Sequence, residues 1–325
     1  MRAGFVGTGY FASEHAGNLK RLGVDVSACY GVDREQVEAF ASGYGAKVFD
    51  SALEMIDPQH IDVLYIVVPP FAHDGEIELA AIGKGIPFLC EKPVGLDVDK
   101  CREIAARIEG KGLVTSSGYW LKAGETAQKV KKLISENEIS FVQAFWHSIF
   151  VPAPWWGKME TSGGPLTEMV THYVDYMREM IGEIDSVCAI SKHGINAARP
   201  NADIYDAITS MIRFKGGQIG ALGSSHLLAL GTEESKRVLE LAGRDFHMCV
   251  ETDTVKYKCG TEDWVELEFE ADRIELNDKR FLEAVGKNDP SLVYGSYADA
   301  VKTLEATVAI TASAEEKNGE WVSVG

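Results

Sequence analysis

A glycine-rich segment near the N-terminus has the residue types and spacing of a phosphate-binding loop. Gly7-Thr8-Gly9-Tyr10-Phe11-Ala12 follows a short apolar run and opens a helical pattern, in the G-x-G-x-x-A form of the dinucleotide fingerprint. Glycines would allow the tight turn and the close approach of a pyrophosphate, and the helix N-terminus would bind the phosphates. A plain turn of small residues explains the isolated motif equally well, but the surrounding alternation of strands and helices favours binding. The expected cofactor contacts here are Gly7, Gly9, Tyr10, Phe11 and Ala12.

The end of the next expected strand, Tyr30-Gly31-Val32-Asp33-Arg34, is where such proteins distinguish NAD from NADP. An acidic side chain binds the ribose 2′-hydroxyl of NAD, whereas an arginine accommodates the 2′-phosphate of NADP. Gly31 stands in the acid's place, and Asp33 and Arg34 just beyond it favour opposite cofactors. Asp33 is at least as well explained as the cap of a helix that begins at Arg34. Asp33 and Arg34 are therefore cofactor-binding candidates, and the cofactor is NAD or NADP, with NAD slightly favoured.

A second group of polar residues recurs at helical spacing after Pro165. Glu168, His172, Asp175 and Glu179 share one face of the expected helix, and apolar side chains occupy the opposite face. Because Glu168 stands four residues before His172, its carboxylate can orient the imidazole and favour the protonated form. Periodicity alone fits a solvated polar face somewhat better. Asp175 either contacts substrate or fixes a loop.

The elements that position these residues follow two different patterns along the 325 residues. The first 120 residues alternate apolar and amphipathic stretches, which predicts parallel strands joined by crossover helices. The run 62–68 is apolar enough for a central strand, and Pro69-Pro70 ends it at the sheet edge where ligands bind. Lys92, held extended by Pro93 after the strand at 88–90, would reach the same edge. The other strands are expected at 3–6, 24–30, 47–49 and 113–116.

The second half has a helix at 124–136, a long strand at 139–150 and further strand-like runs at 187–191, 208–214, 218–224 and 237–241. Few helices separate these runs, which favours a mainly antiparallel sheet. Helices at 272–285 and 296–314 close the chain. The predicted fold is α/β: residues 1–120 form a Rossmann dinucleotide-binding domain on a doubly wound parallel sheet. Residues 121–325 form an α+β domain on an open sheet for substrate binding and oligomerisation.

Composition excludes several classes of partner. The formal net charge is −17, and no basic stripe is present that could neutralise nucleic acid or an anionic membrane. The six cysteines form no C-x-x-C pair, so reduced thiols and a cytoplasmic location are expected, without disulfides or zinc. No apolar run approaches the length of a membrane span. His172 has no histidine or cysteine at ligand spacing, so no metal is expected.

In combination, these motifs resemble the glucose-fructose oxidoreductase, inositol dehydrogenase and rhizopine-catabolism (Gfo/Idh/MocA) family over nearly the whole chain. Val68-Pro69-Pro70-Phe71-Ala72-His73 and Cys90-Glu91-Lys92-Pro93 are similar to that family's nicotinamide-side loop and Glu-Lys-Pro signature. Residues 163–175 (GGPLTEMVTHYVD) are similar to its substrate-domain helix. The chain differs from the family where Glu168 replaces a common aspartate and Gly31 replaces the ribose-binding acid.

The resemblance implies that Lys92 and His172 form the catalytic pair, with Pro69, His73 and Glu91 near the nicotinamide and its ribose. Histidine suits removal of the hydroxyl proton that hydride transfer leaves behind, and lysine suits stabilisation of the alkoxide. We expect Glu168 to orient His172. The substrate-contact candidates are Lys92, Trp156, Lys158, Asp175 and His172.

The sequence thus predicts an NAD(P)-dependent oxidoreductase acting on a sugar, polyol or sugar derivative as a homodimer or homotetramer. Trp156 and Lys158 come from a loop, residues 152–158, whose indoles either form a platform for a sugar ring or simply pack. Two rival functions stay open. One is redox-neutral cleavage of a glycosidic bond through transient oxidation by bound NAD, and the other is a non-catalytic dinucleotide-binding regulator, which would need neither Lys92 nor His172.

Overall fold

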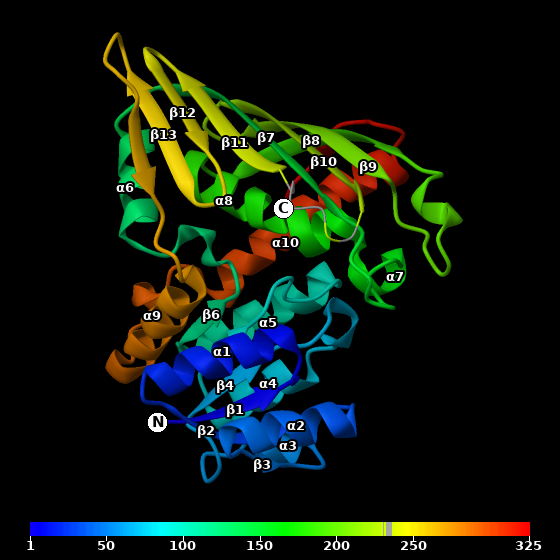
Figure 1. Cartoon of the computed structure of the whole chain (residues 1–325), viewed down its shortest axis with the longest axis vertical. Coiled ribbons are helices and arrows are strands. Elements are labelled where there is room, and N and C mark those ends of the chain that lie inside the picture. Colours follow the sequence, from blue (N-terminus) through cyan, green and yellow to red (C-terminus); the bar gives the residue numbers. More distant parts are fainter. Residues whose placement is uncertain (230, 232–235) are drawn as a thin grey trace. The chain divides into compact units, whose positions relative to one another are not determined.

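The computed structural model describes residues 1–229, 231 and 236–325, and the chain divides into two compact units (Figure 1). The first unit joins Met1–Ala123 with Asp272–Val301, and the second joins Gly124–Ala271 with Lys302–Gly325. No helix in the described part of the chain combines the length and apolar character needed to cross a membrane.

The first unit is built on a six-stranded parallel sheet in the order β3-β2-β1-β4-β5-β6. Its strand order reverses between β1 and β4, so the loops after these two strands lie side by side at the carboxyl edge, where ligands bind in doubly wound folds. The strands are β1 (Arg2–Val6), β2 (Asp25–Tyr30), β3 (Lys47–Val48), β4 (Val63–Ile66), β5 (Phe88–Cys90) and β6 (Thr115–Ser117). The helices are α1 (Tyr10–Arg21), α2 (Arg34–Tyr44), α3 (Ala52–Met55), α4 (Glu76–Lys84), α5 (Val98–Lys111) and α9 (Arg273–Lys287), with short η1 (Pro70–Ala72), η2 (Trp120–Lys122) and η5 (Pro290–Leu292).

The core of this unit includes side chains from the distant segment 272–301. All four residues of β4 are buried, and the ring of Tyr65 stacks on Phe5 with ring centroids 5.0 Å apart. Phe281 of α9 meets the same tyrosine edge-on at 5.8 Å and is fully buried with Ala284. The expected division assigned all of residues 121–325 to the second domain. In the structure, residues 272–301 belong to the first unit because the apolar face of α9 completes its core.

The second unit carries a nine-stranded sheet in the order β14-β13-β12-β11-β7-β10-β9-β8-β15. Strands β7 and β10 pair in parallel, and every other neighbouring pair is antiparallel. The predicted, mainly antiparallel sheet is therefore confirmed. The strands are β7 (Ile139–Ile149), β8 (Ile184–Lys192), β9 (Ala207–Phe214), β10 (Ile219–Leu228), β11 (Lys236–Gly243), β12 (Phe246–Val250), β13 (Thr254–Cys259), β14 (Val265–Glu268) and β15 (Val322–Ser323).

Helices lie on one face of this sheet, where Figure 1 shows α8 and the red helix α10 on the same side of the strands. From Ile208 onward, buried and exposed residues alternate along β9, as expected for a strand with one solvent-facing side. The helices and short turns are α6 (Glu125–Ser135), α7 (Met159–Ser162), η3 (Leu166–Val170), α8 (Thr171–Ile181), η4 (Asn196–Ala198) and α10 (Tyr297–Glu315).

Candidate active site

The glycine loop after β1 has the geometry that a phosphate-binding turn requires. Gly7 has a positive φ of 93°, and a Cβ there would lie 2.0 Å from the carbonyl oxygen of Val67, so only glycine fits. Gly9 is the N-cap of α1, and a Cβ there would have no neighbour within 4 Å. Ala12 is fully buried between helix and sheet. The loop is therefore tightly packed at Gly7 and open at Gly9, while Tyr10 and Phe11 are exposed.

The first turn of α1 differs from that of three other helices in this unit. The carboxylates of Asp33, Asp97 and Asp272 cap α2, α5 and α9 by accepting a backbone N–H. Helix α1 has neither a side-chain cap nor an acidic residue in its first turn. The amide groups and positive dipole end at this turn are therefore suited to an anionic ligand such as a pyrophosphate.

At the end of β2, the carboxylate of Asp33 accepts a hydrogen bond from the backbone N–H of Gln36 at 3.2 Å. This confirms the interpretation of Asp33 as the cap of the helix that begins at Arg34. A Cβ at Gly31 would lie 2.8 Å from Val37, so the expected place of the ribose-binding acid has no room for a side chain without a shift. Arg34 is exposed and pairs with Glu38 and Asp50 at 2.6 and 3.2 Å.

Glu91 and Lys92 follow β5 directly and so lie at the carboxyl edge of the sheet. The Glu91 carboxylate is buried, and its Oε2 accepts the backbone N–H of Lys92 at 3.0 Å. Its Oε1 lies 3.1 Å from Nε2 of His15 in α1. The Lys92 side chain is partly buried, and the Lys92–Pro93 peptide is cis. Pro69, at the end of β4, begins the neighbouring loop.

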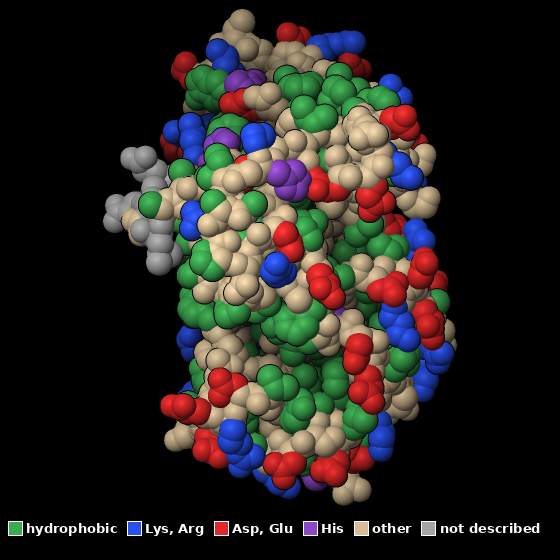
Figure 2. All heavy atoms as spheres, turned by 90° about the vertical axis from the view of Figure 1, so that its right-hand side faces the viewer, with side chains coloured by type: hydrophobic (Ala, Val, Ile, Leu, Met, Phe, Trp, Pro, Cys, Tyr) green, Lys and Arg blue, Asp and Glu red, His purple; other side chains and the backbone are tan. Residues whose placement is uncertain are grey.

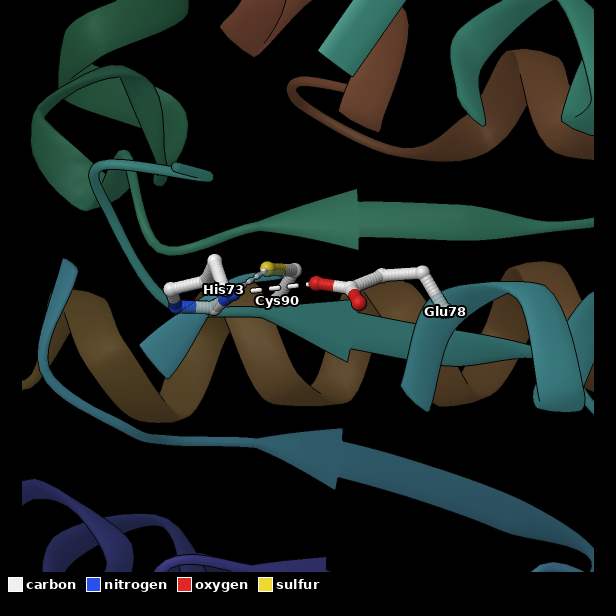
Figure 3. Close-up of side chains that lie close together, drawn as sticks. All are labelled: His73, Glu78 and Cys90. Atoms are coloured by element: carbon white, nitrogen blue, oxygen red, sulfur yellow. Dashed lines mark hydrogen bonds and ion pairs between the residues drawn. The ribbon is translucent and has the colours of Figure 1, made fainter. Parts of the chain in front are cut away.

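His73 lies in a compact cluster with Glu78 and Cys90, shown in Figure 3. Its Nδ1 is 2.9 Å from Glu78 Oε1 and 3.7 Å from the Cys90 sulfur, and these three atoms could reach one cation. Burial raises the pKa of the Cys90 thiol well above its usual range, so the thiol is protonated at neutral pH. The bond to Glu78 fixes the His73 ring at the edge of the sheet, while its Nε2 is buried without a hydrogen-bond partner among the described residues.

The helix expected from Pro165 is irregular at its start. Residues Leu166–Val170 form a π-helical turn, and the regular helix α8 begins only at Thr171. In a π turn the hydrogen bonds run from i to i+5 instead of from i to i+4. Glu168 Oε2 accepts a hydrogen bond from the indole of Trp156 at 2.6 Å. Single π turns are frequent at functional sites.

The polar face of this helix is buried, which contradicts the solvated alternative. His172 is 6% exposed, and its ring lies nearly parallel to Trp146, with centroids 6.3 Å apart. The guanidinium of Arg237 lies 4.5 Å from the centroid of the Trp146 ring. His172 therefore stands in a layered aromatic and cationic environment inside the second unit.

The remaining substrate candidates have structural partners within the second unit. Trp156 is 0% exposed and packs edge-on against Phe150, so no sugar ring can stack on it in this arrangement. Asp175 is buried and accepts a hydrogen bond from Thr303 of α10 at 3.1 Å, which fixes α8 against α10. Lys158 is partly exposed, and its Nζ lies 3.2 Å from a carboxylate oxygen of Asp203.

Sequence reasoning missed two buried residues of the first unit, His15 and Asp278. Nδ1 of His15 lies 2.7 Å from Oδ1 of Asp278, although 263 residues separate them. Asn18 donates to the other oxygen of Asp278 at 2.8 Å. A histidine and an asparagine at i and i+3 on the inner side of α1 were the available signal, but nothing local indicates their distant partner.

Acidic and basic side chains are interspersed over the face of the molecule shown in Figure 2. This view agrees with the net charge of −17 and offers no basic stripe on that face for a phosphate backbone.

The strand order 3-2-1-4-5-6 and the glycine loop at its switch point define a dinucleotide-binding fold of the Rossmann class. Residues 1–119 match the family described as "Oxidoreductase family, NAD-binding Rossmann fold", and residues 127–245 match the "GFO/IDH/MocA C-terminal domain". The chain therefore belongs to the Gfo/Idh/MocA family, and it is an NAD(P)-dependent oxidoreductase.

Curated relatives and solved structures agree with this assignment. The chain is 23% identical to the myo-inositol 2-dehydrogenase of Thermotoga maritima over 78% of this chain and 77% of that one. It is 24% identical to the 1,5-anhydro-D-fructose reductase of Ensifer adhaerens over 67% of each. A levoglucosan dehydrogenase in complex with NADH has the same fold, with a TM-score of 0.89 at 18% identity over 100% of this chain and 99% of that chain.

Proposed function

We propose that this protein transfers a hydride between NAD(H) and a hydroxyl or carbonyl carbon of a sugar, polyol or sugar derivative. The substrate class is inferred from relatives that are named for myo-inositol and 1,5-anhydro-D-fructose. NAD(H) is favoured over NADP(H) because Arg34, the residue that would accept a 2′-phosphate, is already paired with two carboxylates.

The observation that carries the proposal is the start of α1. Open space at Gly9, a helix end without a carboxylate cap, and Gly7 fixed by Val67 are together what a dinucleotide pyrophosphate needs. The residues present therefore fit the cofactor. The bound nicotinamide would supply the hydride chemistry, and the protein's own groups would handle the proton and the developing charge.

Two side chains are assigned to that task. His172 is the acid and base that removes or returns the hydroxyl proton, because an imidazole titrates near neutral pH. Lys92 places positive charge beside the same oxygen and stabilises its alkoxide form. Glu168 is proposed to orient His172, and its bond to Trp156 would hold the carboxylate in place. Trp156 would then influence the reaction only indirectly, by holding the Glu168 carboxylate that orients His172.

Cofactor binding is the first test. Purified protein is titrated with NADH and with NADPH, and energy transfer from tryptophan to the reduced nicotinamide reports binding, with His172→Ala as the binding-competent control. Failure of both cofactors to bind at about millimolar concentration would overturn the proposal. Tight binding of NADH alone would support the assignment of NAD.

Turnover is tested next with myo-inositol, 1,5-anhydro-D-fructose, levoglucosan and simple aldoses as probes. Oxidation of one of these with equimolar NADH production, lost in His172→Ala and Lys92→Met, would support the proposed roles. Cleavage of a glycoside without net NADH would instead favour the redox-neutral rival. A function that both variants retain would favour the regulator.

We also propose that the protein works in the cytoplasm as a homodimer or homotetramer. The solvent side of β8, β9 and β10 presents Ile190, Met211 and Ile219, which are 63%, 54% and 55% exposed on adjacent strands. Such an apolar row is a natural surface for a second copy. Light scattering after size-exclusion chromatography tests this, and Met211→Lys is expected to shift the mass toward the monomer.

A further inference from the structure

A chain of buried charged groups runs through the first unit to the segment that carries Lys92. His15 of α1 is 1% exposed, and its two ring nitrogens lie 2.7 Å from Asp278 and 3.1 Å from Glu91. We call Asp278, His15 and Glu91 the His15 network. It links α1, α9 and the end of β5, which are far apart in sequence.

The charges of this network are fixed by its geometry. When both neighbours are ionised carboxylates, each ring nitrogen must carry a hydrogen, which gives the imidazolium form. Burial raises the pKa of Asp278, and the charge of His15 and its hydrogen bond oppose that rise. Burial lowers the pKa of His15, but the carboxylates of Asp278 and Glu91 outweigh burial and raise this pKa to about 10. The ring of Tyr65, 5.4 Å away, is the aromatic neighbour of the imidazole. One cation therefore stands between two anions in the interior.

The Glu91 carboxylate is held on three sides. Oε1 contacts His15, Oε2 accepts the N–H of Lys92, and a Cβ on Gly118 would lie 2.3 Å from the carboxylate. Rotating this side chain would leave the imidazolium with an unpaired side and the Lys92 amide without its acceptor. Both losses are costly in a buried site.

We propose that His15 and Asp278 are positioning residues, which act through Glu91 to hold the backbone of Lys92 in place at the sheet edge. This inference rests on the proposed function, because that function gives Lys92 its role at the substrate oxygen. Neither residue touches the reacting atoms, and neither belongs to the glycine loop or the Glu-Lys-Pro motif.

The variant His15→Gln tests the proposal, because an amide cannot neutralise two carboxylates. Asp278→Asn is the milder variant, since it keeps an acceptor for the imidazole. His60→Gln is the matched control: His60 lies in the same unit, packs on Phe49 and has no contact with the network. Amide hydrogen exchange is measured by mass spectrometry on peptides that cover residues 91–96 and α4.

We expect exchange at residues 91–96 to accelerate at least tenfold in His15→Gln and less in Asp278→Asn, with α4 and the His60→Gln protein unchanged. Unchanged exchange at 91–96 in a folded His15→Gln protein would overturn the proposal. If His15→Gln does not fold, Asp278→Asn decides by the same measurement. Equal acceleration everywhere would show a merely structural role and would also overturn it.

Two further readouts complete the test. In protein labelled with ¹⁵N-histidine, the His15 resonances are identified as those that are lost in His15→Gln. They should show an imidazole that stays doubly protonated at pH 9, and a titration of these resonances near pH 6.5 would refute the assigned charge. With a substrate found by the turnover screen, His15→Gln should lower kcat at least tenfold while KM and the Kd for NADH change less than threefold. Exchange and NMR need no turnover, so failure of this inference is distinguishable from failure of the proposed function.

Discussion

Gly9→Ala separates cofactor binding from folding, because the two glycines of the loop meet different surroundings. At Gly9 the φ of −77° suits alanine, and the added Cβ meets no protein atom within 4 Å. Replacing glycine by alanine at a helix N-cap should cost roughly 0.5 kcal/mol of folding free energy. The new methyl group instead fills the space that a pyrophosphate must enter. Loss of one or two charge-assisted hydrogen bonds, about 1.5–3 kcal/mol, should weaken NADH binding by roughly 10- to 150-fold.

The assay is a fluorescence titration with NADH, paired with urea unfolding of the same samples. Gly83→Ala is the control, because Gly83 lies within α4 with open space around it. That change should stabilise the protein by roughly 0.5–1 kcal/mol and leave the Kd for NADH unchanged. Gly7→Ala should lose both folding stability and binding, because its Cβ would strike the Val67 carbonyl. Wild-type affinity in Gly9→Ala would refute the placement of the phosphates at this helix.

Three further results are expected. His172→Asn should lower kcat at least 100-fold with NADH binding intact, since removing a general base costs about 10²–10⁴ in rate. The measurement is a stopped-flow assay with an identified substrate, and a variant that keeps more than a tenth of kcat would contradict the role of His172 as the base. Asp175→Ala should destabilise the protein by about 2–4 kcal/mol in urea unfolding, because it leaves Thr303 and Arg178 with fewer partners in a buried site; a change under 1 kcal/mol would argue against this anchor. Burial is the main cause that lowers the pKa of His226 to about 4. The neutral imidazole therefore contributes fully to the free energy of unfolding above pH 6.5, and this contribution is lost as the pH falls toward 4. Between pH 7 and pH 5, the free energy of unfolding of His226→Gln should therefore fall by about 2 kcal/mol less than that of wild type. Urea unfolding at both pH values measures this, and an equal fall in the two proteins would contradict a neutral, buried His226.

The parts of this protein that local pattern determines were predictable. All six strands of the first sheet overlap the ranges expected for them. The prediction was easiest for β4 and β5, because a strand buried on both faces needs an apolar run. The Asp33 cap and the turn at Gly7 likewise depend on near neighbours. In the second unit, β12 to β15 were not predicted, because short strands such as Val265–Glu268 are mostly exposed and carry little apolar alternation.

What was not predictable depends on distant packing. The polar face after Pro165 looked solvated, but α10 covers Asp175 through Thr303, more than a hundred residues away. The bond between Glu168 and Trp156 was not predicted, because helical periodicity gives no sign of a partner in the preceding loop. The His15 network needs Asp278, whose only local sign is a polar residue within an amphipathic helix.

Helix α9 belongs to the first unit but is synthesised long after the rest of that unit. When residue 123 leaves the ribosome, the first sheet still lacks Phe281 for its core and Asp278 for the imidazolium of His15. The ribosome must add the intervening 124–271 segment first, which takes roughly 7–30 s at ordinary elongation rates. During that interval the nascent unit carries an uncovered apolar surface and an incompletely paired buried charge. The N-terminal domain should therefore be a target for chaperones on the ribosome until its last helix is made.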